Sequence, residues 1–177
     1  MNIIDKTHPL NELKGSSTFS LFLAGPCPRG SREDSAWEKQ WHGEAVQMIK
    51  DICMELEIPS NITVCIPLPY ASDDFQEGVD WEENYLEDAK HILFWVPRDL
   101  EKLPGFTTNV EFGEWMKSGK CTLAYPDGAP KMRYLQSKAE KYSIPVYHDL
   151  REALKRIIVK YVQPIQNSYS ELLYKKV

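Results

Sequence analysis

The sequence lacks the features that would place it in a membrane, in a secretory pathway or on a nucleic-acid backbone. Its apolar runs are much shorter than the roughly 20 residues that a membrane-spanning helix needs. The first stretch, MNIIDKTHPLNELKG, is too polar for a signal peptide. The net charge of -5 disfavours a general affinity for phosphate backbones. We therefore expect a cytoplasmic protein whose partner is a small molecule rather than a nucleic-acid polymer or a membrane.

Patterns typical of metal sites and disulfide frameworks are also missing. The four cysteines form no CxxC pair, and no two of the four histidines have the spacing of metal ligands. We predict free buried thiols and no metal. The 177 residues suffice for one domain, and 42% hydrophobic with 27% charged residues is an ordinary globular balance.

Short apolar runs alternate with longer amphipathic stretches along the chain. The predicted strands are residues 18–24, 61–67, 91–96, 120–125 and 144–147. The predicted helices are residues 35–56, 80–90, 107–118, 131–141 and 148–161. This alternation predicts a doubly wound, flavodoxin-like α/β fold, with a parallel sheet of order 2-1-3-4-5 and helices on both faces. We expect an N-terminal extension over residues 1–17, one domain over 18–161 and a C-terminal tail over 162–177.

Ligands of such sheets bind beyond the carboxyl ends of the strands, where the strand order reverses. This rule selects three loops, at residues 25–34, 69–80 and 97–111. Whichever residues contact a ligand, we expect them on these loops or on the helices that follow.

The first of these loops, AGPCPRGSRED with Ala24 included, combines glycines, a hydroxyl and two guanidinium groups just before a helix. Such groups suit a phosphate or a ribose. The candidate substrate contacts are Gly25, Pro26, Arg29, Gly30 and Ser31. The loop fits neither the Walker pattern nor GxGxxG, and the alternative is a polar loop in which Asp34 or Ser35 caps the helix.

The stretch FTTNVEFGEW, residues 106–115, has two interpretations that the residues leave open. Thr108 and Glu111 have the spacing of a capping box, in which both only help the helix to begin. Glu111 would also lie where a ligand binds, and a carboxylate there could attack an anomeric carbon. Asp88, at a helix end where the dipole disfavours an acid, is the candidate for a second, proton-handling group.

Three segments together resemble the nucleoside 2-deoxyribosyltransferases and the related nucleotide N-glycosidases. They are FLAGP, WEENYLEDAKHILFWVP, and NVEFGEW with the following SGK. The resemblance implies that Glu111 is the glycosyl nucleophile and that Asp88 handles protons at the base. It places Trp81 and Tyr85 beside Asp88. Further candidate contacts are Phe106, which could stack on a base as Trp81 could, and Thr108.

The resemblance implies cleavage or exchange of the N-glycosidic bond of a (deoxy)nucleoside or nucleoside 5′-monophosphate, with no metal or organic cofactor. It also implies a homo-oligomer, because a neighbouring subunit's loop closes the site in the family. Family members often have an aspartate shortly before the nucleophile, but residues 105–108 here contain no acid, which leaves the substrate open. The alternatives are a nucleotide-binding sensor without turnover, or a glycohydrolase of another ribosyl compound such as NAD.

Overall fold

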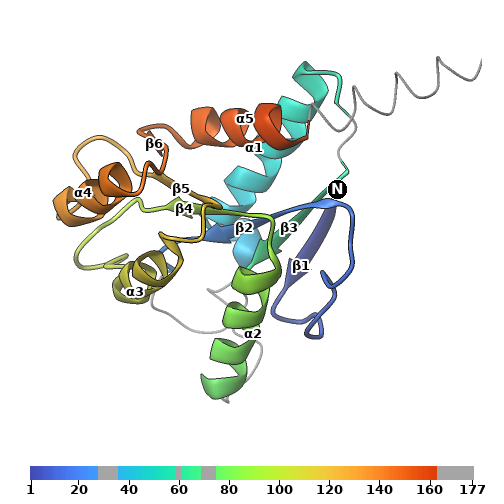
Figure 1. The fold of residues 1–177 in the computed structure, drawn as a ribbon, viewed down its shortest axis with the longest axis horizontal. Coiled ribbons are helices and arrows are strands. Elements are labelled where there is room, and N and C mark those ends of the chain that lie inside the picture. The colour runs from blue at the N-terminus through green and yellow to red at the C-terminus, as the bar shows by residue number, and fades with distance from the viewer. Residues whose placement is uncertain (28–35, 59–60, 69–74, 163–177) are drawn as a thin grey trace, which may run out of the picture.

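One parallel sheet of six strands forms the centre of the protein (Figure 1). The computed structural model describes residues 1–27, 36–58, 61–68 and 75–162. The strands are β1 (Asn2–Asp5), β2 (Phe19–Ala24), β3 (Ile62–Ile66), β4 (His91–Trp95), β5 (Cys121–Ala124) and β6 (Val146–Tyr147). They lie in the order β1-β3-β2-β4-β5-β6, and each neighbouring pair is parallel.

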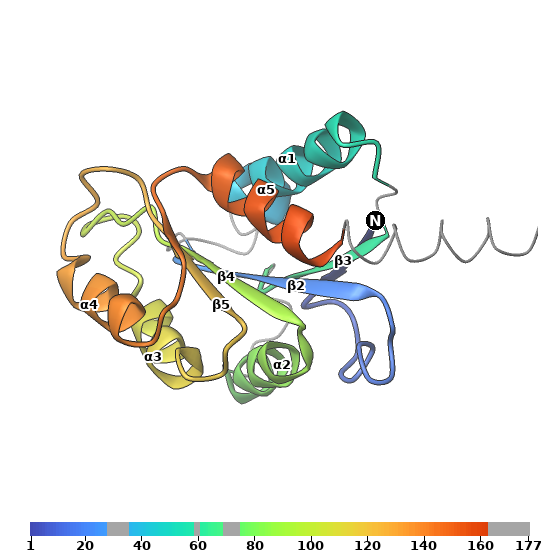
Figure 2. The same ribbon diagram turned by 45° about the horizontal axis from the view of Figure 1, so that its top comes forward.

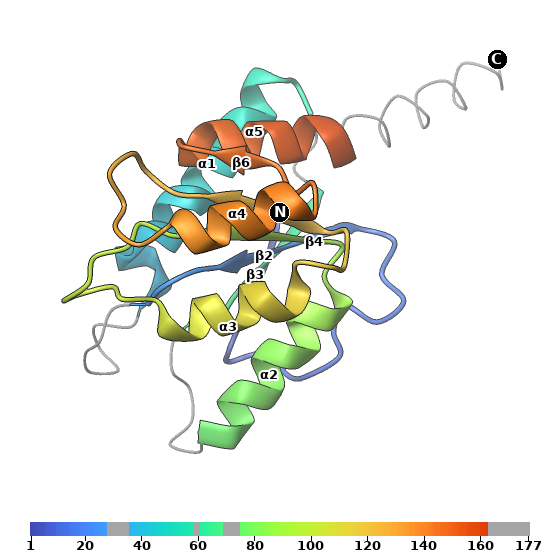
Figure 3. The same cartoon turned by 60° about the vertical axis from the view of Figure 1, so that its left-hand side comes forward.

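Helices cover both faces of this sheet. They are η2 (Trp37–Lys39), α1 (Trp41–Glu55), α2 (Phe75–Asp88), α3 (Phe106–Trp115), α4 (Arg133–Lys141) and α5 (Leu150–Tyr161). Figure 2 shows α1 and α5 on one side and α2 and α3 on the other, and Figure 3 shows α4 beside α3. The core accordingly divides into one cluster under α1 and α5 and another under α2, α3 and α4.

Burial on both faces explains why the central strands read as continuous apolar runs. All residues of β2, β3 and β4 are buried. A parallel sheet covered by helices on both sides requires this, because neither set of alternating side chains meets water. Among the described helices, none combines the length and apolar character needed to cross a membrane.

The predicted fold class is confirmed, with one addition at the edge of the sheet. The five predicted strands keep their predicted order, as β3-β2-β4-β5-β6. The sixth strand, β1, comes from the segment predicted to be an extension, and it pairs with β3 through the Cα register Asn2↔Thr63 to Asp5↔Ile66. α2 begins at Phe75, earlier than residue 80, and includes Gly78, whose low helix propensity argues against a helix there. Most of the predicted tail, residues 163–177, lies outside the described residues.

Candidate active site

The strand order reverses at β2, whose neighbours β3 and β4 lie on opposite sides of it. The loop after β2 approaches its surroundings closely. A Cβ atom on Gly25 would lie 2.2 Å from the Trp95 carbonyl oxygen and 2.8 Å from a ring carbon of Trp41. The Trp41 indole N–H also donates to the Pro26 carbonyl, at 3.1 Å. Only glycine fits at residue 25, so this loop is held tightly against the end of β4.

The same loop packs against the beginning of α3. Gly105 has φ +64°, and a Cβ atom on it would lie 3.3 Å from Pro26 Cβ. Gly105 is the N-cap of α3, and no side chain caps this helix. The predicted capping box is therefore wrong: Thr108 lies inside the first turn, buried, and Glu111 is the sixth residue of the helix. A left-handed glycine that ends the preceding loop replaces the expected threonine cap.

Glu111 is half-buried, and its carboxyl group is hydrogen-bonded to that of Glu82 on α2. Two carboxyl groups can share a hydrogen bond only if one of them carries a proton. Burial, followed by the charge and the hydrogen bond of Glu82, raises the pKa of Glu111 from 4.5 to about 8, while Lys6 opposes the shift. The pair therefore holds a proton at neutral pH.

Cys27 connects the loop after β2 with this carboxyl pair. Burial, together with the nearby charges of Glu82 and Glu111, raises the pKa of the Cys27 thiol to about 12. The thiol therefore stays protonated and is not a competing nucleophile. Its electrostatic contact with both carboxyls places the pair at the carboxyl edge of the sheet, beside the strand reversal.

Asp88 does not lie beside Glu111. It is the last residue of α2, at the amino-terminal edge of the sheet, and it interacts electrostatically with Lys120. The Lys120 ammonium donates to the carbonyls of Leu86, Glu87 and Ala89, at 2.7, 2.6 and 3.1 Å. α2 runs antiparallel to the strands, so its last residue is carried away from the edge where α3 begins. The expected pairing of Asp88 with Glu111 is corrected to a pairing of Glu82 with Glu111.

Trp81 and Tyr85 are placed in the core, where they bind the N-terminal segment. Both side chains are buried. The Trp81 indole N–H donates to the His8 carbonyl at 3.1 Å, and the Tyr85 hydroxyl donates to the Pro9 carbonyl at 2.5 Å. Their polar groups are thus engaged within the chain, and contact of either ring with substrate stays a prediction.

The other predicted contacts divide into three groups. Gly25, Pro26 and Thr108 are brought together where the β2 loop meets α3. Phe106, 67% exposed, stands at the first position of α3. Arg29, Gly30 and Ser31 lie outside the described residues.

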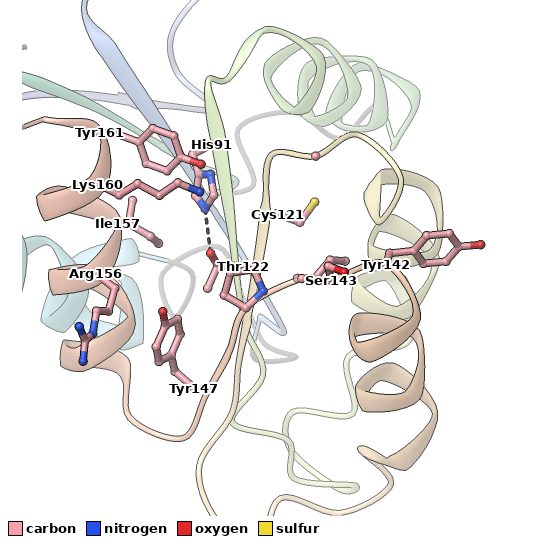
Figure 4. Close-up of a pocket in the computed structure, with 13 residues that line it drawn as sticks. His91, Cys121, Thr122, Tyr142, Ser143, Tyr147, Arg156, Ile157, Lys160 and Tyr161 are labelled. Atoms are coloured by element: carbon pink, nitrogen blue, oxygen red, sulfur yellow. Dashed lines mark hydrogen bonds between the residues drawn. The ribbon is translucent and has the colours of Figure 1, made fainter. Parts of the chain in front are cut away.

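A separate cavity of about 140 Å³ lies between β4, β5 and α5, toward the amino-terminal ends of these strands (Figure 4). His91 accepts or donates a hydrogen bond with the Thr122 hydroxyl there, at 2.9 Å, and its ring packs on Tyr161. None of its described lining residues is acidic. The cavity is at the opposite edge from Glu82 and Glu111, so we place the candidate active site at the carboxyl pair.

Two residues of this site were not predicted from the sequence. Glu82 is one of several acids in its segment. The only feature of the sequence that distinguishes it is Gly78, which lies one turn earlier on the same face of the helix. Lys6 pairs with Glu82 at 2.6 Å, but it comes from a segment far away in sequence and has no motif around it. Within the described part of the chain, no three His, Cys, Asp or Glu side chains cluster so as to hold a metal ion.

Comparison with known proteins assigns the family. The profile of the family described as "nucleoside 2-deoxyribosyltransferase like" matches residues 18–129, which is more than half of the chain. The match includes β2, α2, β4 and α3, and therefore both Glu82 and Glu111. No curated protein matches the sequence. The chain belongs to the nucleoside 2-deoxyribosyltransferase-like family.

Proposed function

We propose that this protein cleaves or exchanges the N-glycosidic bond of a (deoxy)nucleoside or its 5′-monophosphate, using Glu111 and Glu82 as one catalytic unit. The observation that supports this most directly is the proton-sharing pair of carboxyls at the carboxyl edge of the sheet. Glycosyl transfer needs a nucleophile at the anomeric carbon and a proton for the leaving group. A pair that holds one proton offers both.

The steps follow from the position of that proton. The glycosidic C1′–N bond breaks, and its electron pair goes to the base nitrogen. The proton of the pair moves through Glu82 to the departing base, which leaves Glu111 as a carboxylate. An oxygen of Glu111 then bonds to C1′. Water or a second base attacks C1′ in the next step, the bond to Glu111 breaks, and the incoming group returns a proton to the pair.

The surroundings favour this division of roles. Lys6 forms an ion pair with Glu82 at 2.6 Å, so we expect it to favour negative charge on Glu82 and the proton on Glu111 before substrate binds. As a carboxylate, Glu82 can also accept the proton from Glu111 and transfer it to the base. The β2 loop and α3 contribute Gly25, Pro26 and Thr108 beside the same edge, where a sugar could bind.

A screen for base release tests this proposal. The purified protein is incubated with deoxynucleosides, ribonucleosides and their 5′-monophosphates, with and without a second base, and the products are measured by mass spectrometry. We expect release by the wild type and a loss of at least about 10³-fold in Glu111→Gln. Glu83→Gln, which removes an exposed carboxylate next to Glu82, is the matched control and should retain activity.

The incubations with and without a second base distinguish transfer from hydrolysis. Release that needs the second base indicates a transferase, and release without it indicates a hydrolase. Base release by Glu111→Gln at the wild-type rate, or tight nucleotide binding by the wild type without any release, would contradict the proposal.

A further inference from the structure

The side chain of Lys6 reaches the carboxyl pair from the N-terminal segment of the chain. Its ammonium lies 2.6 Å from a carboxylate oxygen of Glu82. The Lys6 side chain is only 7% exposed, whereas that of Glu82 is 26% exposed. The attraction between two charges shielded to this degree is less screened than on the surface, and an ammonium left without its partner there would be costly.

The backbone on both sides of Lys6 is fixed. Before it, β1 pairs with β3 as far as Asp5↔Ile66, and the Lys6 N–H donates to the Leu68 carbonyl at 3.4 Å. After it, the Asp5 carboxylate accepts from the Thr7 N–H and hydroxyl, at 3.0 and 2.6 Å. This turn directs the chain away from the sheet, so the position of Lys6 does not depend on its ion pair alone.

Helix α2 accommodates the lysine and holds the segment that follows it. A Cβ atom on Gly78 would lie 3.4 Å from the Lys6 ammonium, which is van der Waals contact, so this turn of α2 lies directly against the lysine. Further along α2, Trp81 and Tyr85 bind the carbonyls of His8 and Pro9. Asn84 accepts from the Asn11 N–H at 3.0 Å. The N-terminal segment is thus attached along the same helix that presents Glu82.

We propose that Lys6 is a positioning residue of the active site, which holds Glu82 as a carboxylate against Glu111 and so determines which of the two keeps the shared proton. The inference rests on the proposed function of the pair. It also extends the site beyond the family match, which begins at residue 18. The site of this protein is therefore incomplete without β1.

The charged and titratable groups around the pair come from four segments. They are Asp5, Lys6 and His8 in the N-terminal segment, Cys27 after β2, Glu82 on α2, and Glu111 with Glu114 on α3. Of these, Cys27 keeps its proton because burial raises its pKa. His8 is paired with Asp5, at 3.0 Å. Lys6 is thus the cation that contacts the pair directly among the residues that the structure describes.

The test compares Lys6→Met, which removes the charge, with Lys6→Arg, which keeps it. The matched control is Lys14→Met, which removes an exposed lysine of the same segment. The first measurement needs no substrate: the glutamate carboxyl carbons are labelled with ¹³C, and the Glu111 signal, assigned with Glu111→Gln, is titrated by NMR. The second measurement is the pH profile of kcat/KM for base release.

The sign of the expected shift follows from the charge. Lys6 lowers the pKa of Glu111, so its removal should raise the pH at which the pair loses its proton, by about one unit or more. Lys6→Met should show this shift in the titration and in the alkaline limb of the rate profile. Lys6→Arg and Lys14→Met should titrate as the wild type does.

Two results would overturn the inference: an unchanged Glu111 titration in Lys6→Met, or an equal shift in Lys6→Arg. Both results come from the NMR titration of the protein without substrate. A wild type that releases no base contradicts the proposed function instead, and it leaves the titration as a valid test of Lys6. A Lys6→Met variant that does not fold is replaced by Lys6→Gln, read against the same controls.

Discussion

Glu82 and Asp88 are two carboxylates on the same helix, and the structure gives them opposite surroundings. They are six positions apart, which is about 9 Å along the helix axis and about 120° around it. Glu82 meets Lys6 and Glu111 at the carboxyl edge of the sheet. Asp88 lies near Lys120 at the other edge. An acid that precedes the central strand in sequence therefore does not lie at the edge of the candidate active site, because the helix returns the chain to the opposite edge before that strand begins.

The two edges of the sheet also differ in what a lysine does there. Lys6 neutralises a carboxylate within the candidate active site, whereas Lys120 binds the last carbonyl groups of α2. Carbonyls at a helix C-terminus have no partner within the helix, and a cation there also complements the helix dipole. We therefore propose that Lys6 acts on the chemistry and Lys120 on folding, so variants of the two lysines should differ accordingly.

The largest expected effect is the difference between Glu82→Gln and Asp88→Asn. Glu82→Gln should lower kcat/KM for base release by about 10²–10⁴-fold, because it removes the route of the proton to the base. Asp88→Asn should change it by less than about threefold, since a group at the opposite edge touches no reacting atom. Both variants are measured at one pH, with folding checked by circular dichroism. Equal losses of kcat/KM would contradict the assignment of Glu82, and not Asp88, to the candidate active site.

The pH dependence of the rate should follow the carboxyl pair. Because burial and Glu82 raise the pKa of Glu111 to about 8, kcat/KM should fall about tenfold per pH unit above that value. The loss reflects the shared proton, which the leaving base needs. The same alkaline limb should persist in Asp88→Asn. A rate that stays constant between pH 7 and pH 10 would show that the proton of the pair is not used.

Lys120→Met should affect folding and not catalysis. Three carbonyl oxygens lose their donor, so we expect the free energy of unfolding to fall by about 2 kcal/mol, which is about 4–8 °C in Tm. Thermal denaturation measures this, with Lys50→Met on the exposed side of α1 as the control. A reduced rate per folded molecule in Lys120→Met would contradict the separation of the two edges.

The smallest expected effect is on stability at alkaline pH. The pKa of Glu111 is raised on folding, so its contribution to stability is fully present below its ordinary value of 4.5 and is lost as the pH rises through about 8. Glutamine does not ionise. At pH 9, Glu111→Gln should therefore have a Tm about 2–4 °C above that of the wild type, which corresponds to about 1 kcal/mol in the free energy of unfolding. At pH 5 the difference in Tm should be smaller. A constant difference across this range would contradict the raised pKa.

Much of the fold was predictable because it depends on local patterns. Apolar runs such as β4 and the amphipathic stretch of α1 determine which residues must be buried, and their alternation determines the crossovers. The position of Glu111 at the strand reversal followed from the same argument. Its helix start did not, because Gly105 supplies the cap through a backbone angle that its neighbours impose.

The partners of Glu111 depend on contacts that no local pattern contains. Glu82 was one acid among several, and only the rotation of α2 selects it. The role of Lys6 could not be predicted, because its position depends on the pairing of β1 with β3 at the edge of the sheet. A polar segment with a short apolar run, Asn2–Asp5, gives little indication of that pairing until the neighbouring strand is in place.

The most direct test of the account is to find where the sugar is bound during turnover. The reaction is quenched with acid, the protein is digested with trypsin, and the peptide Leu103–Lys117 is sequenced by mass spectrometry. We predict a glycosyl adduct on Glu111, absent from Glu111→Gln and present at normal or higher occupancy in Asp88→Asn. An adduct on another residue, or continued base release by Glu111→Gln without any adduct, would contradict the central role of Glu111.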